Sequence, residues 1–228
     1  MEWLKVKVWG PYACFARPEF SVERLSYDVM TPSAARGILE AIFWKPEFRW
    51  EVREIWILNQ IRHITFLRNE LAARQGQAPI FVEEQRQQRT TRALKEVAYL
   101  ILAEPILRPH ATDDIAKYRD QFRRRVDRGQ CYHTPYLGTR EFAAYFAPPD
   151  GSEQPFDPTL TLRLGTMFFD WRYRQYPARP EVTFHRHGSQ GVSTVKGWAE
   201  ALFFQAKLRN GKLIIPPEQY KEVEDNNA

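Results

Sequence analysis

The chain has 228 residues, of which 43% are hydrophobic and 14% aromatic, and its formal charge is +5 at neutral pH. This content suffices for a packed core, and no apolar run is long enough to span a bilayer, which argues against a membrane protein. Two cysteines, Cys14 and Cys131, are too few for a disulfide framework or a cysteine metal site. We therefore expect a cytoplasmic protein with no membrane partner and no metal or other cofactor.

The charge is unevenly distributed along the chain. Residues 216–228 carry a net charge of −3, so the rest of the chain carries +8. Arginine outnumbers lysine 24 to 9. Guanidinium groups bind phosphate through a fork of N–H donors and stack on planar rings, so this composition is typical of nucleic-acid binding. An ordinary basic protein remains an equal alternative on composition alone.

Residues 3–9 alternate in polarity and predict a strand. Leu4, Val6 and Val8 would face a core, and the other face would carry four basic or aromatic residues, Trp3, Lys5, Lys7 and Trp9. That second face is either an RNA-binding surface or a contact with another domain that buries the two tryptophans.

A helix is predicted over residues 31–44, with Thr31 as N-cap, Pro32 at the first helical position and Pro46 beyond its end. Gly37 inside this helix is expected to mark close approach to another backbone. A strand follows at 50–61.

The polar segment 62–92 is predicted to be a projecting hairpin or a mobile loop, and its Arg89 and Arg92 are candidate RNA-binding residues. Residues 93–104 predict a third strand. A basic helix at 113–127 is expected to stop at Gly129, and a strand at 137–146 follows.

This order of strand, helix, strand, strand, helix, strand predicts an α+β fold, with a ferredoxin-like (RRM-like) N-terminal domain over residues 1–147. Proline-rich loops then lead to strand candidates at 160–171, 181–187 and 200–215, the last a hairpin turning at Asn210-Gly211. We predict a smaller antiparallel β-rich C-terminal domain over 148–217 and a disordered acidic tail over 218–228.

The basic helix carries the strongest candidate site. Lys117, Arg124 and Arg128 share one face and could hold a phosphate chain, although a solvated helix face is the plain alternative. Tyr118 could move a proton, but its spacing with Phe122 favours a core aromatic. His133 follows the helix and titrates near neutral pH, as a general acid or base must, although a lone histidine in a turn is more often structural.

A second pair of histidines, His185 and His187, alternates on a predicted strand. No carboxylate or cysteine accompanies this pair at a useful spacing, so we do not expect a metal site there.

Five segments together resemble one known family. They are Gly10-Pro-Tyr-Ala-Cys-Phe, Ile42-Phe-Trp-Lys-Pro46, Gln88-Arg-Thr-Thr-Arg-Ala-Leu, Gly129-Gln-Cys-Tyr-His-Thr-Pro-Tyr-Leu-Gly-Thr-Arg-Glu-Phe142 and Leu164-Gly-Thr-Met167. In order and spacing the chain resembles CRISPR-associated endoribonucleases of the type I-C (Dvulg) system, in the RAMP superfamily.

The resemblance implies metal-independent cleavage of CRISPR repeat precursor RNA at the base of its hairpin. It also implies that the protein then stays on the 5′ handle of the mature guide RNA. Its partners would be the backbone and large subunits of the DNA-targeting effector complex, with duplex DNA as a further candidate.

The family's catalytic set is a tyrosine at the end of the first helix and a lysine–histidine pair near the second. Here Phe43 stands at the tyrosine position, Lys117 matches the lysine, and Tyr118 replaces the histidine. Either His133 supplies the missing imidazole or the site is arranged differently. We expect Lys117 to stabilise charge and Tyr118 or His133 to act as acid or base. The rival prediction is a non-catalytic subunit that caps the guide RNA, and a basic protein with no nucleic-acid role is a third.

Overall fold

A computed structural model describes residues 3–20, 22–73, 76 and 79–224. The helices are α1 (Pro32–Ile42), α2 (Ile115–Asp127) and α3 (Glu218–Glu224), with a short 3₁₀ helix η1 (Val82–Glu84). The strands are β1 (Leu4–Ala13), β2 (Arg24–Leu25), β3 (Phe48–Ile57), β4 (His63–Leu71), β5 (Arg86–Leu107), β6 (Tyr145–Ala147), β7 (Leu162–Gln175), β8 (Val182–Gly188), β9 (Gly191–Arg209) and β10 (Lys212–Ile214). No helix in the described part of the chain is long and apolar enough to cross a membrane.

The strands of the described residues form one sheet in the order β6-β1-β5-β3-β10-β9-β7, with β2 and β4 also pairing β5, and β8 pairing β9. Apart from the short parallel β2–β5 contact, these pairs are antiparallel. The coarse prediction of a mixed chain dominated by antiparallel sheet is therefore confirmed. The predicted boundary at residues 147/148 remains a prediction, and β10 from beyond it pairs with β3.

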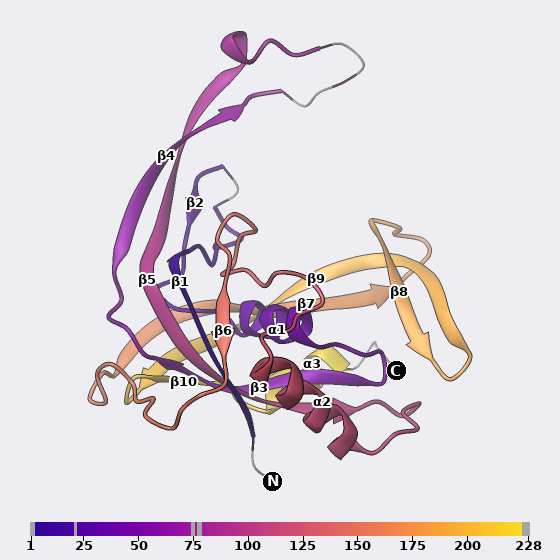
Figure 1. Cartoon of the computed structure of the whole chain (residues 1–228). Coiled ribbons are helices and arrows are strands. Elements are labelled where there is room, and N and C mark those ends of the chain that lie inside the picture. Colours follow the sequence, from indigo (N-terminus) through magenta and orange to yellow (C-terminus); the bar gives the residue numbers. More distant parts are fainter. Residues whose placement is uncertain (1–2, 21, 74–75, 77–78, 225–228) are drawn as a thin grey trace.

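Helices α1 and α2 lie on one face of the β1–β5–β3 part of the sheet (Figure 1). Trp50 of β3 contacts both of them. Its ring packs on Phe122 of α2, with centroids 4.7 Å apart, and its indole Nε1 donates to the carbonyl of Phe43 at the end of α1 over 2.9 Å. The alternation predicted for β1 is confirmed, because Leu4, Val6 and Val8 are buried in this core.

Helix α1 begins as its sequence predicts. The Thr31 hydroxyl accepts a hydrogen bond from the Ala34 N–H over 3.3 Å, and Pro32 occupies the first turn. The explanation offered for Gly37 was wrong, because no atom lies within 4 Å of where its Cβ would stand. The glycine is therefore not required by packing.

The segment predicted as a hairpin or a mobile loop is a hairpin. Strand β4 pairs with the first part of β5, from His63↔Leu94 to Leu71↔Arg86, and projects well beyond the rest of the molecule (Figure 1). Strand β5 is therefore 22 residues long and starts before the predicted residue 93. The hydrophobic pattern gave no sign of this extension because both faces of the projecting part meet solvent.

The strand predicted at 137–146 was wrong for most of its length, since only Tyr145–Ala147 form β6. Residues 137–144 form a turn in which the Leu137 N–H donates to the Phe142 carbonyl over 2.7 Å. Gly138 has a φ of 88°, and a Cβ there would lie 2.0 Å from the Cys14 carbonyl oxygen. The chain turns here because glycine permits both this conformation and this close contact.

The hairpin predicted over residues 200–215 is present, but its first strand, β9, already begins at Gly191. The turn between β9 and β10 falls at Asn210 and Gly211, both with positive φ. The predicted disordered tail is corrected for residues 218–224, which form α3, while residues 225–228 lie outside the described residues.

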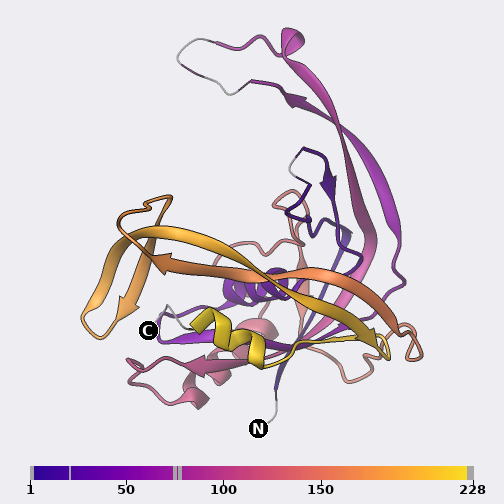
Figure 2. The same cartoon turned by 180° about the vertical axis from the view of Figure 1, so that it is seen from behind.

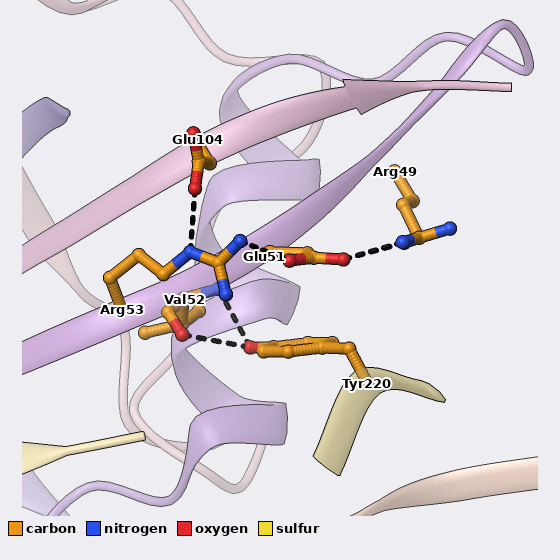
Figure 3. Close-up of polar contacts among 6 residues, drawn as sticks. All are labelled: Arg49, Glu51, Val52, Arg53, Glu104 and Tyr220. Carbon is orange, nitrogen blue, oxygen red and sulfur yellow. Dashed lines mark hydrogen bonds and ion pairs between the residues drawn. The ribbon is translucent and has the colours of Figure 1, made fainter. Parts of the chain in front are cut away.

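Helix α3 is attached to β3 by Tyr220 (Figure 3). The buried Tyr220 hydroxyl donates to the Val52 carbonyl over 3.0 Å and accepts from the Val52 N–H over 2.7 Å. Beside it, Arg53 Nε donates to Glu104 over 2.6 Å and its Nη2 pairs with Glu51. This contact is why a segment with an acidic, polar sequence is ordered.

Candidate functional site

The first turn of α2 holds the candidate lysine. Asp114 caps the helix by accepting from the Ala116 N–H over 2.7 Å. The exposed Lys117 Nζ donates to Asp113 Oδ2 over 2.7 Å. This hydrogen bond, together with the negative charge of Asp113, raises the pKa of Lys117. Lys117 is therefore a cation at neutral pH, suited to stabilising negative charge and not to accepting a proton.

Tyr118 lies in the core, as its apolar spacing indicated. Its ring packs against Phe48, with centroids 5.2 Å apart, and its hydroxyl oxygen is buried with no hydrogen-bond partner among the described residues. Burial, with the nearby carboxylate of Glu47 as the next cause, raises the pKa of Tyr118. In this conformation the hydroxyl does not meet solvent.

Phe43, which the resemblance assigns to the position of the family tyrosine, is also buried. Its ring packs on Phe48 at 5.5 Å, so Phe48 lies between Phe43 and Tyr118. The guanidinium of Arg125 lies over the Phe43 ring at 5.4 Å and donates to the Ile42 carbonyl over 2.8 Å. The end of α1 is thus fixed to the second half of α2.

The turn carrying His133 is attached to the same end of α1. The backbone N–H groups of Tyr132 and His133 donate to the Ala41 carbonyl over 2.7 and 3.4 Å, and both side chains are exposed. Ile42, the residue after Ala41, accepts a hydrogen bond from Arg125. Arg125 lies about 12 Å along the axis of α2 from Lys117, at a rise of about 1.5 Å per residue. The structure therefore does not bring Lys117, Tyr118 and His133 into one cluster: His133 and Lys117 lie near opposite ends of α2.

Two exposed arginines lie on the surface of α2 between Lys117 and the turn that carries His133. Arg124 and Arg128 lie on the same helical face as Lys117, about 10 and 16 Å along the axis from it. Neither has an ion pair with another described residue. The basic face predicted from the sequence is therefore present, with Lys117 as its carboxylate-paired member.

The other RNA-binding candidates lie on β1 and on the projecting hairpin, and Lys5 lines a pocket together with Arg123 of α2. Lys5 is exposed on the outer face of β1, whereas Lys7 pairs with Glu153 over 3.4 Å. Arg89 on the projecting hairpin pairs with Glu70 over 3.3 Å, and Arg92 is exposed on the same strand.

The outer face of β1 is neither fully open nor buried under a second domain. Trp3 and Trp9 are 37% and 36% exposed. The segment after β6 partly covers them: Pro148 lines one pocket of about 240 Å³ with Trp3 and another of about 570 Å³ with Trp9.

Sequence reasoning missed one neighbour of the site. The His187 ring of β8 packs edge-on against Trp44, the residue after Phe43, with centroids 5.4 Å apart. From the sequence, His187 was weighed only as a possible metal ligand. No local pattern indicated that β8 would reach the end of α1. Two imidazoles, those of His133 and His187, therefore flank this end.

Comparison with known proteins agrees with the resemblance. The pattern of the family described as "CRISPR-associated protein (Cas_Cas5)" matches residues 3–213. A protein of Thermus thermophilus named "CRISPR pre-crRNA endoribonuclease Cas5d" is 59% identical over 96% of this chain and 94% of its own length. A protein of the same name from Mannheimia succiniciproducens is 36% identical over 96% of this chain and 97% of its own.

A solved structure described as a CRISPR-associated protein has the same fold, with a TM-score of 0.63 at 22% identity over 93% of this chain and 91% of that one. The match to the family extends over nearly all the described residues, from β1 to β10. This chain belongs to the CRISPR-associated Cas5 family.

Proposed function

We propose that this protein is an endoribonuclease that cleaves CRISPR precursor RNA without a metal ion. The observation that carries the proposal is the 59% identity, over almost the whole chain, to a protein named as a CRISPR pre-crRNA endoribonuclease. The exposed basic face of α2 supports it, because such a face neutralises phosphates.

The proposed reaction uses the substrate's own ribose. The 2′-hydroxyl attacks the adjacent phosphorus in line and its proton passes to a base, while the 5′-oxygen leaves with a proton from an acid. The products are a 2′,3′-cyclic phosphate and a 5′-hydroxyl. Positioned acids and bases contribute about 10²–10⁴-fold to such reactions.

Lys117 is proposed to stabilise the additional negative charge on the phosphoryl group. RNA would first have to displace or share Asp113, which holds the ammonium group at 2.7 Å. Arg124 and Arg128 are proposed to bind flanking phosphates along the same helix face.

His133 is the preferred acid or base over Tyr118. Its imidazole is exposed, whereas the Tyr118 hydroxyl is buried and would need the ring to leave Phe48. Because His133 and Lys117 lie near opposite ends of α2, one scissile phosphate cannot contact both of them in this conformation. Their joint action in the reaction therefore requires α2 or the turn that carries His133 to move when the RNA binds.

Further parts of the proposal concern the fold and the partners. The antiparallel order β6-β1-β5-β3, with α1 and α2 on one face, supports a ferredoxin-like unit. We also propose a cytoplasmic protein that stays on the guide RNA and contacts the backbone and large subunits of an effector complex, with duplex DNA as a further ligand.

The test is cleavage of a cognate repeat RNA in EDTA, beside a copy with a 2′-deoxy nucleotide at the scissile position. We expect the first to be cut and the second to remain intact. A requirement for a divalent ion, or cleavage of the deoxy copy, would refute the mechanism.

A non-catalytic RNA-binding subunit is the second candidate. Phe43 lacks the hydroxyl of the family tyrosine, and the Tyr118 hydroxyl is buried. Tight binding of repeat RNA with no cleavage under any metal condition would decide for this alternative.

A further inference from the structure

Strands β7 and β9 form a long twisted ribbon along one side of the molecule (Figure 2). One face of this ribbon packs on the core through Met167, Phe204 and Leu208, which are buried. Side chains alternate between the faces of a strand, so the residues between these point the other way. We call that side the outer face, and its members are Arg163, Thr166, Phe168, Trp171 and Tyr173 of β7 with Phe203, Gln205 and Lys207 of β9.

Aromatic rings run along the middle of the outer face. Phe168 lies opposite Phe203 in the strand register and packs on it at 5.9 Å, and it contacts Trp171 at 5.4 Å. Trp171 and Phe203 are 40% and 41% exposed, and Tyr173 is also exposed. Phe168 and Trp171 lie on the same face although they are three residues apart, because the register shift between Phe168 and Asp170 inserts one extra residue, Phe169. Phe169 points toward the core, and Trp171 therefore returns to the outer face.

Two cations face each other at one end of the aromatic row. Arg163 lies directly opposite Lys207, and neither forms an ion pair with another described residue. Like charges in directly opposed positions of a sheet destabilise it. Between them and the phenylalanines, Gln205 donates to the Thr166 hydroxyl over 3.0 Å.

Carboxylates are missing from the described strand positions of this outer face. Asp170 points inward, where it binds Arg36, and Glu200 lies on the opposite face with Arg172. The outer face therefore has aromatic rings and unneutralised positive charge, and no negative charge that would repel a phosphate.

We propose that the outer face of β7 and β9 binds a single-stranded segment of RNA. Bases would stack on Phe203, Trp171 and Tyr173, and the phosphates would lie beside Arg163 and Lys207. Trp171 and Tyr173 are two residues apart, about 7 Å along the strand, a spacing at which each ring can take a separate base.

This site is distinct from the basic face of α2 and does not depend on cleavage. An apolar protein surface is the other ligand class that exposed aromatics accept. The opposed cations with no carboxylate among the described neighbours favour a polyanion over such a surface.

The experiment measures binding of a fluorescent oligouridylate of about eight nucleotides, a length within the range that stacking platforms occupy. The probe has no hairpin, and binding is its only readout, so failure of the cleavage proposal would not affect it. The charge variant is Arg163→Gln/Lys207→Gln, and the matched control is Arg62→Gln/Arg179→Gln, which removes two exposed, carboxylate-paired cations elsewhere.

For the charge variant we expect at least a tenfold loss of affinity at low salt. The slope of log affinity against log salt should fall by about 1.4, since each phosphate contact on a single strand contributes about 0.7. Removal of the like-charge pair should leave the melting temperature unchanged or higher, so misfolding cannot imitate this result.

A second variant, Trp171→Leu, should weaken binding about tenfold and reduce the quenching of tryptophan fluorescence by the RNA. Equal affinity and salt slope for the charge variant and its control would overturn the proposal. Unchanged RNA binding in both the charge variant and Trp171→Leu would overturn it as well.

Discussion

Arg36 of α1 binds two carboxylates in different surroundings, and this difference gives a quantitative prediction. Its Nε and Nη2 donate to Asp170 of β7 over 2.8 and 2.7 Å, and its Nη1 donates to Glu40 over 2.7 Å. The Asp170 side chain is 8% exposed, whereas that of Glu40 is 31% exposed. Asp170 also accepts from the Trp171 N–H over 2.8 Å.

The paired variants Asp170→Asn and Glu40→Gln each remove one charge and keep the side-chain size. In the first, the amide nitrogen of the introduced asparagine would face one N–H of the arginine, so a donor would meet a donor. Breaking a buried ion pair costs about 3–5 kcal/mol, which we reduce to about 2–3 kcal/mol because Arg36 itself is partly exposed. An exposed pair one helical turn apart contributes about 0.3–0.5 kcal/mol.

Thermal unfolding followed by circular dichroism measures both. For a chain of this size each kcal/mol shifts the melting temperature by about 2–4 °C, so we expect Asp170→Asn to lower it by about 4–12 °C. Glu40→Gln should lower it by no more than about 2 °C. Equal losses in the two variants, or no loss in Asp170→Asn, would show that burial does not separate these two contacts.

Three other measurements follow from buried groups and from α2. Tyr220→Phe removes the hydroxyl that pairs with the N–H and the carbonyl of Val52. In urea unfolding this variant should lose about 2–4 kcal/mol of unfolding free energy. A loss below about 0.5 kcal/mol would contradict the attachment of α3 to β3. Burial raises the pKa of the Cys14 thiol, whereas Cys131 is exposed, so a thiol reagent at mildly alkaline pH should label Cys131 alone until the protein is unfolded. Rapid native labelling of Cys14 would be inconsistent with its burial. Lys117→Ala should lower the single-turnover cleavage rate by at least about 100-fold while changing RNA affinity less than tenfold, and equal changes in both would make Lys117 a binding residue.

The sequence predicted those features that depend on neighbouring residues. Thr31 and Pro32 specify the start of α1 locally, and Asn210-Gly211 specifies a turn, so both were found correctly. The extent of strands was less predictable. The turn at 137–144 depends on contact between Gly138 and Cys14, which are far apart in sequence.

The composition of the site depended on similar long-range contacts. Tyr220 orders the acidic tail by binding Val52, 168 residues away, and no local pattern indicates this. His187 reaches Trp44 only because β8 follows the curve of β9. Spacing on α2 did indicate correctly that Tyr118 would be buried, but it could not reveal that His133 would lie by Ala41, away from Lys117.

Analysis of the cleavage ends tests the central proposal most directly. After incubation of a repeat RNA with the protein in EDTA, mass spectrometry should find a 2′,3′-cyclic phosphate on the upstream fragment and a 5′-hydroxyl on the downstream one. These ends require attack by the ribose hydroxyl. A 5′-phosphate on the downstream fragment would mean that water is the nucleophile, and would contradict the account.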